Sequence, residues 1–106
     1  MHSQFLLAAL LALGSTVALA NGPPPALQKA GCMACHGTAS KIVGPGYNEV
    51  AARYKGQADA EGKLVAKLKA GGQGVWGAIP MPPQTQLKDE DAHRLVKWIL
   101  SGAKAQ

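Results

Sequence analysis

The stretch that most constrains this chain is "GCMACH", residues 31–36, which holds both cysteines of the sequence and a histidine directly after the second one. Cysteines at this spacing occur in three kinds of site: a redox dithiol or disulfide, half of a zinc site, and an attachment point for haem. Each kind of site needs different partners elsewhere in the chain. The remaining sequence therefore decides which of the three the motif forms.

An apolar segment near the start of the chain predicts export. Residues 5–13 read "FLLAALLAL", and the small-residue pattern "ALA" follows at residues 18–20, as in a secretory signal peptide with its cleavage site. The run is shorter than the roughly 20 apolar residues that span a bilayer. We therefore predict a signal peptide at residues 1–20 and one mature domain at residues 21–106. An uncleaved membrane anchor is the alternative, because no Lys or Arg precedes the run.

The predicted mature domain is small, basic and poor in large apolar side chains. It contains all eleven Lys and Arg and all six Asp and Glu, which gives a net charge of +5, and its aromatic residues are two Trp and two Tyr. A domain this short is marginally stable without a covalent or bound staple. A disulfide between Cys32 and Cys35 would close only a tiny loop. We therefore expect another group to fill the core.

The apolar pattern predicts helices, and no period-two alternation indicates a sheet. Helix formers occupy residues 26–35, with the cysteine pair at their end, and "YNEVAARY" predicts a helix at residues 47–54. Asp59 can cap a third helix at residues 60–70. The last helix is expected from about residue 89 to residue 101, with an apolar stripe formed by Ala92, Leu95, Val96 and Ile99.

Two long loops separate the predicted helices, at residues 38–46 and 71–87. The second loop carries Gly and Pro throughout its length. Long loops in compact domains are usually functional, which makes the second loop a candidate for a functional role.

The rest of the sequence favours haem for the cysteine pair over the other two kinds of site. A zinc site needs four ligands, and after His36 the chain offers only His93. A thioredoxin-like dithiol needs a βαβ setting, whereas C-x-x-C-H is the pattern of haem attachment. On a helical turn Cys32 and Cys35 lie on one face, where each can form a thioether with one haem vinyl group. The imidazole of His36 can then reach the iron from the same side.

A haem ligated on both faces needs a second axial ligand, and Met81 is the favoured candidate. Met33, between the cysteines, cannot reach round the ring. Three prolines stiffen the loop around Met81, because each fixes φ near about −65°; they are Pro80, Pro82 and Pro83. A preorganised thioether loses little entropy when it binds iron. His93 is the rival ligand, and we expect it to be a half-exposed histidine of the last helix.

Four stretches together resemble the small class I cytochromes c of bacteria, of the c-551 type: "GCMACH", "VGPGY", "GQGVWGAIPMPP" and "LVKWIL". The match extends from about residue 26 to residue 101. The Trp-Gly pair followed by Pro-Met-Pro-Pro is more discriminating than C-x-x-C-H alone. The resemblance implies an all-α fold in which about four helices surround one covalently attached haem c.

The resemblance also implies roles for individual residues of the site. His36 and Met81 would be the axial ligands of the iron. The backbone carbonyl of Pro45 would accept a hydrogen bond from His36, which fixes the imidazole tautomer. The indole N–H of Trp76 would donate to a haem propionate. Lys67 stands where the family often has an arginine near a propionate, and a lysine is a point charge rather than a planar fork.

The function implied by the resemblance is electron transfer, without catalysis, by a soluble monomeric carrier in the periplasm. Because both axial positions would be filled, no position is left for a substrate. A nitrite reductase and a terminal oxidase are both reasonable recipients of the electron. The alternatives are a haem module anchored to, or part of, a larger membrane complex, and a ligand-binding sensor or enzyme from which Met81 is displaced. The basic charge would also suit nucleic acid, but export argues against that partner.

Redox partners are expected to dock at the exposed haem edge, where the attachment segment and the Met81 loop meet. Transient redox encounters use small interfaces, below about 1,200 Å². The apolar candidates for this docking surface are Met33, Ala78, Ile79, Pro82 and Pro83.

Overall fold

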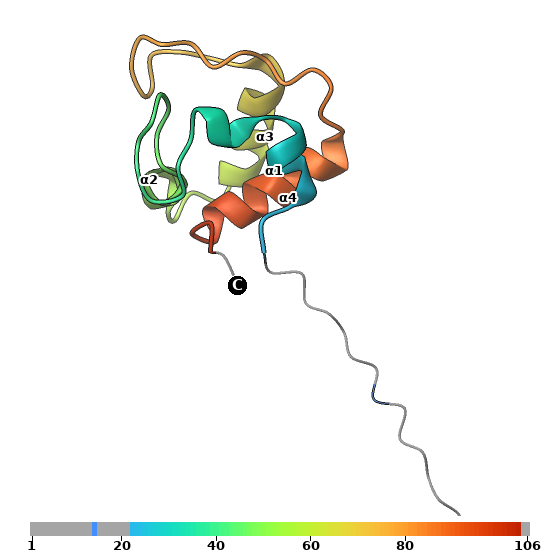
Figure 1. Cartoon of the computed structure of the whole chain (residues 1–106). Coiled ribbons are helices and arrows are strands. Elements are labelled where there is room, and N and C mark those ends of the chain that lie inside the picture. Colours follow the sequence, from blue (N-terminus) through green and yellow to red (C-terminus); the bar gives the residue numbers. More distant parts are fainter. Residues whose placement is uncertain (1–13, 15–21, 105–106) are drawn as a thin grey trace, which may run out of the picture.

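The computed structural model describes residue 14 and residues 22–104 of the chain (Figure 1). The predicted signal peptide, with its cleavage point after residue 20, lies outside the described residues except for Gly14. Within the described part of the chain, no helix is both long enough and apolar enough to cross a membrane.

The described residues form four α-helices and one short 3-10 helix, in agreement with the predicted all-α architecture. The α-helices are α1 (Pro25–Lys29), α2 (Tyr47–Tyr54), α3 (Ala60–Ala70) and α4 (Asp89–Leu100), and the 3-10 helix η1 (Cys32–Ala34) follows α1. Between residues 22 and 104 the only β-type pairings are two isolated bridges, His36 with Lys41 and Gly72 with Met81.

The last helix, α4, is the central element against which α1, α2 and α3 pack. Its predicted apolar stripe is buried, with Ala92 and Leu95 completely inaccessible to solvent. Burying a side chain such as Leu95 contributes on the order of 1.5–3 kcal/mol. The helix begins with Asp89 and two further acidic residues, which suit its positive N-terminal end, and Lys97 suits its C-terminal end.

The prediction of a single helix over residues 26–35 is wrong. Helix α1 ends at Lys29, because Gly31 adopts a left-handed conformation with φ of 70° that an α-helix cannot contain. The chain then turns into η1, which contains Cys32 and Met33. A 3-10 helix has three residues per turn, so the cysteines at i and i+3 still face the same way. The break therefore changes the helix but leaves the two cysteines facing one side.

Helix α3 has the predicted bounds, but its start differs from the prediction in one respect. Asp59 occupies the N-cap position without a side-chain capping bond, because its φ and ψ of −100° and 11° depart from the extended conformation of such caps. Its carboxylate instead forms an exposed ion pair with Lys63 (3.3 Å). At the other end, Gly71 terminates α3 with φ of 68°. The second loop, residues 71–87, begins at this glycine.

The two long loops lie on the same side of the helices, and together with η1 they enclose a cavity. In Figure 1 the loop of residues 38–46 is green and the loop of residues 71–87 runs from gold to orange above the helices. Side chains from both loops line this cavity, along with side chains from α2, α3 and α4. The site is thus formed by α2, α3 and α4 together with the two loops and Cys32 of η1.

Candidate functional site

The cavity has a volume of about 510 Å³ and a mainly apolar lining. Ligand and cofactor cavities measure about 300–1,000 Å³, so this one is large enough to hold a cofactor. No Asp or Glu of the described residues lines it. The lining brings together every residue that the sequence predicted for the haem site: Cys32, Cys35, His36, Pro45, Lys67, Trp76 and Met81.

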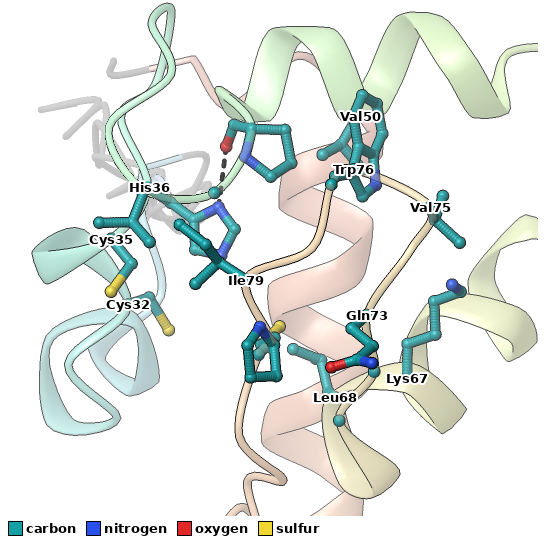
Figure 2. Close-up of a pocket in the computed structure, with 18 of the residues that line it drawn as sticks. Cys32, Cys35, His36, Val50, Lys67, Leu68, Gln73, Val75, Trp76 and Ile79 are labelled. Atoms are coloured by element: carbon teal, nitrogen blue, oxygen red, sulfur yellow. Dashed lines mark hydrogen bonds between the residues drawn. The ribbon is translucent and has the colours of Figure 1, made fainter.

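The two cysteines lie at one end of the cavity, next to His36 (Figure 2). No disulfide joins them, and Cys32 is buried while Cys35 is exposed. Burial raises the pKa of the Cys32 thiol above its ordinary value, and the neighbouring Tyr47 hydroxyl acts in the opposite direction. Elsewhere among the described residues, no three His, Cys, Asp or Glu side chains gather in a way that could hold a metal ion.

The imidazole of His36 is fixed by contacts on several sides. Its Nδ1 lies 2.8 Å from the Pro45 carbonyl oxygen, drawn as the dashed line in Figure 2. Because a carbonyl can only accept, Nδ1 carries the proton and donates, which leaves Nε2 with a free lone pair. The ring also stacks on Tyr47, with centroids 5.1 Å apart and an interplanar angle of 16°. Nε2 is thus available as an iron ligand.

Gly44 supports the imidazole from close range. A Cβ atom at this position would lie 2.5 Å from Cε1 of His36, closer than any ordinary contact. The N–H groups of Val43 and Gly44 both donate to the Cys35 carbonyl, at 3.0 and 2.8 Å. The loop of residues 38–46 is therefore folded back against the attachment segment, and only a glycine fits where its backbone meets the ring.

Met81 is held at the end of α3 by backbone hydrogen bonds. The Gly72 N–H donates to the Met81 carbonyl (3.1 Å) and the Met81 N–H donates to the Gly72 carbonyl (2.8 Å). Three residues after Met81, the Gln84 N–H donates to the Leu68 carbonyl (2.8 Å). The backbone of Met81 also passes directly over Gly71, where a Cβ would collide with it. The half-buried Met81 side chain thus reaches the cavity from a fixed position.

The opposite end of the cavity contains Lys67 on α3 and Trp76 on the loop (Figure 2). Arg53 of α2, which the sequence analysis did not single out, stacks its guanidinium over the Trp76 ring, with Cζ 4.7 Å from the centroid. It also donates to the Val75 carbonyl (3.2 Å). Nothing in the sequence pattern pairs the last turn of α2 with a loop more than twenty residues away, so only the fold reveals this contact.

His93, the rival ligand, lies away from the cavity. It does not line the cavity wall, and its Nδ1 lies 2.8 Å from a carboxylate oxygen of Glu61 on α3. The side chain is 47% exposed. The prediction of a half-exposed helix histidine is confirmed.

An apolar rim surrounds the mouth of the cavity, and it differs in part from the predicted docking surface. Ala78, Ile79 and Pro82 line the cavity as expected, and Ile79 is 68% exposed. Met33 is exposed but does not line the cavity, and neither does Pro83. The sequence analysis missed three exposed apolar side chains that do line it: Ile42, Val43 and Val75.

Comparison with known proteins gives a consistent family. The cytochrome c family model matches residues 14–103. Cytochrome c-551 of Pseudomonas aeruginosa is 46% identical over 100 residues, which cover 92% of this chain and 95% of that protein. Cytochrome c2 of Rhodocyclus tenuis is 60% identical over 79 residues, which cover 70% and 85% of the two chains. The crystal structure of wild-type Nitrosomonas europaea cytochrome c552 superposes with a TM-score of 0.69 at 45% identity, over 71% of this chain and 93% of that one.

The family confirms the haem interpretation of the cysteine motif. In a cytochrome c, C-x-x-C-H carries covalently bound haem c, and Cys32 and Cys35 provide that pair here. The cavity fits the group because it is large and apolar, has both cysteines at one end, and lacks carboxylates. Cytochromes of the c-551 type carry electrons and are not enzymes. This chain therefore belongs to the class I cytochromes c, as a monohaem electron carrier close to the c-551 and c-552 proteins.

Proposed function

We propose that this chain is a diffusible periplasmic carrier that shuttles single electrons between respiratory redox proteins, with His36 and Met81 as the axial ligands of the haem iron. The observation that supports this most strongly is that both side chains line the same cavity as the cysteines and are held in place by the backbone. Haem c supplies the redox chemistry by gaining and losing one electron at its iron.

The surrounding residues tune the site for a high reduction potential. The neutral thioether of Met81 donates little electron density, and the apolar walls disfavour the extra positive charge of the oxidised site. The hydrogen bond from His36 to Pro45 fixes the tautomer and strengthens the imidazole as a ligand. We assign the Trp76 indole N–H and the Lys67 ammonium to the propionate groups, because both residues line the far end of the cavity.

We further propose that redox partners dock on the apolar rim of the cavity. The rim consists of side chains from both loops, namely Ile42, Val43, Val75, Ala78, Ile79 and Pro82. Apolar contact there would bring the two redox centres close over a small interface. Two cationic side chains, Lys41 and Lys67, also line the cavity, and their charge would mainly affect the encounter rate. A nitrite reductase or a terminal oxidase would be a suitable recipient.

The localisation belongs to the same proposal. Residues 1–20 would be removed on export, so that the mature chain begins at Asn21 and works as a monomer. Fractionation of the native cells, with mass spectrometry of the haem-containing protein, tests this directly. A periplasmic product that begins at Asn21 is expected. A full-length chain in the membrane fraction would instead favour the anchored module.

The axial ligands are tested by the absorption spectrum of the ferric protein. Methionine-ligated ferric haem shows a weak far-red band, and Met81→Ala should abolish this band, lower the reduction potential and allow cyanide or imidazole to bind. His93→Ala is the matched control, because His93 is exposed on α4 and bonded to Glu61, and it should leave the spectrum unchanged. A far-red band that survives in Met81→Ala and disappears in His93→Ala would overturn the assignment.

A further inference from the structure

The far part of the second loop, residues 73–80, is held differently from its base. At the base, Gly72 and Met81 form two backbone hydrogen bonds with each other. Beyond them the loop closes on itself through one bond, from the Gly74 N–H to the Gly77 carbonyl (2.7 Å). Both of these glycines have positive φ, 96° and 124°, so the backbone has conformational freedom that other residues would remove. The backbone of this far part is therefore held by one internal hydrogen bond, and Trp76 packs against the hydrophobic core.

Arg53 connects the far part of the loop to α2. Its guanidinium lies over the Trp76 ring while its Nη1 donates to the Val75 carbonyl. A planar guanidinium can stack on an aromatic face and donate in its own plane at the same time, which a lysine ammonium cannot do. Over residues 22–104, no other side chain outside the loop forms a hydrogen bond with residues 73–80.

The two residues that Arg53 contacts both belong to the cavity wall. Val75 and Trp76 line the end of the cavity opposite the cysteines (Figure 2). Arg53 forms no ion pair with any carboxylate of the described residues. The Arg53 side chain therefore contacts the loop and does not pair with a carboxylate of the described residues.

We propose that Arg53 is a positioning residue that holds residues 73–80 closed over the haem cavity. The closed loop keeps Trp76 in the cavity wall and limits the entry of water. A dry site disfavours the added positive charge of the oxidised haem. The contact of Arg53 with Val75 and Trp76, here called the clamp, therefore helps to keep the reduction potential high. This inference rests on the proposed ligation by His36 and Met81, because the potential is that of the six-coordinate haem.

Hydrogen exchange of the holoprotein tests the clamp at the backbone. In Arg53→Ala, the Gly74 amide should exchange about 5- to 20-fold faster than in the wild type. This is the increase expected when one exposed cation–ring contact and one hydrogen bond are lost together. The Gly72 amide, which is bonded to Met81 at the base of the loop, should stay within about twofold. The reduction potential should fall, while the far-red band should persist and show that Met81 is still bound.

Two variants separate the clamp from a simple loss of charge. Arg94→Ala removes the same charge from the exposed face of α4, and it should leave the Gly74 exchange and the potential as in the wild type. Arg53→Lys keeps a cation near the Trp76 ring but loses the planar guanidinium that stacks and donates at the same time. The Gly74 amide of this variant should therefore exchange at an intermediate rate. The proposal fails if Gly74 exchange is unchanged in Arg53→Ala, or rises equally in Arg94→Ala. Loss of the far-red band in the wild type would instead refute the ligation.

Discussion

The contact between Gly44 and His36 gives a sharp prediction, because a single methyl group should displace the imidazole. In Gly44→Ala, the new Cβ would lie 2.5 Å from Cε1 of His36, whereas ordinary Cβ contacts begin at 3.4 Å. Either the ring or the loop must therefore move by roughly 1 Å. The φ of Gly44 lies outside the left-handed region, so an alanine backbone fits there without strain. The expected effect is purely steric.

The size of the effect follows from how tightly the ring is held. The ring cannot move away from Gly44 without disturbing the hydrogen bond to Pro45 or the stacking on Tyr47. Overpacking of this kind costs about 1–3 kcal/mol. For a domain of this length, each kcal/mol lowers Tm by about 4–8 °C. We therefore expect the Tm of holo Gly44→Ala to fall by roughly 5–20 °C.

Gly62→Ala is the matched control for this substitution. Gly62 lies within α3, where an added Cβ would meet nothing within 4 Å. Alanine at a helix interior should stabilise the protein by about 0.5–1 kcal/mol, which raises Tm by a few degrees. The assay is thermal unfolding followed by circular dichroism, with the exchange rate of the His36 Nδ1 proton as a second readout. Equal Tm values and equal proton exchange for Gly44→Ala and the wild type would refute the close packing of the ring.

Three further predictions concern docking, folding and pH. Ile79→Glu should slow electron transfer to the natural partner severalfold without changing the spectrum, because Ile79 is the most exposed of the large apolar side chains on the rim. Lys104→Gln should leave the rate unchanged, and equal rates for Ile79→Glu and the wild type at low and moderate salt would place docking elsewhere. Replacing both Cys32 and Cys35 by Ala should leave a largely disordered apoprotein, since the cavity lies within the core; native-like helical circular dichroism without haem would contradict this. Burial raises the pKa of Tyr47 above its ordinary value, which is about 10, because the folded protein favours the neutral hydroxyl. The stabilisation that this preference gives is complete below about pH 10 and is lost as the pH rises further. Tyr47→Phe should therefore flatten the alkaline decline of Tm, and identical slopes would count against it.

The sequence predicted the helices wherever a long amphipathic pattern was available. The bounds of α2 and α3 match the prediction, and α4 ends one residue earlier than expected. The segment at residues 26–35 failed because composition does not reveal the left-handed conformation of Gly31, which separates α1 from η1. Asp59 failed as a side-chain cap because capping depends on backbone angles that residue type alone does not set.

For the site, the sequence could name the residues but not what holds them. All of the residues that the sequence predicted for the haem site line the cavity: Cys32, Cys35, His36, Pro45, Lys67, Trp76 and Met81. The sequence also indicated a stiff loop around Met81, but its anchoring to Gly72 is a pairing of backbone groups, which every residue type except proline can make. The contact of Arg53 with Trp76 and the position of Ile42 on the rim depend on how distant segments meet. Such contacts arise from packing and leave no local pattern.

In the proposed site, Met81 would bind the haem iron on the face opposite His36. Proton NMR of the reduced holoprotein with labelled methionine methyl groups tests it most directly, because a methyl group held over the haem ring is shifted far upfield by the ring current. The mature chain would contain two methionines, Met33 and Met81. We predict one methyl signal far upfield, absent from Met81→Ala, and an ordinary signal for Met33, which is exposed. Two methyl signals at ordinary positions, or an upfield signal that persists in Met81→Ala, would contradict the claim.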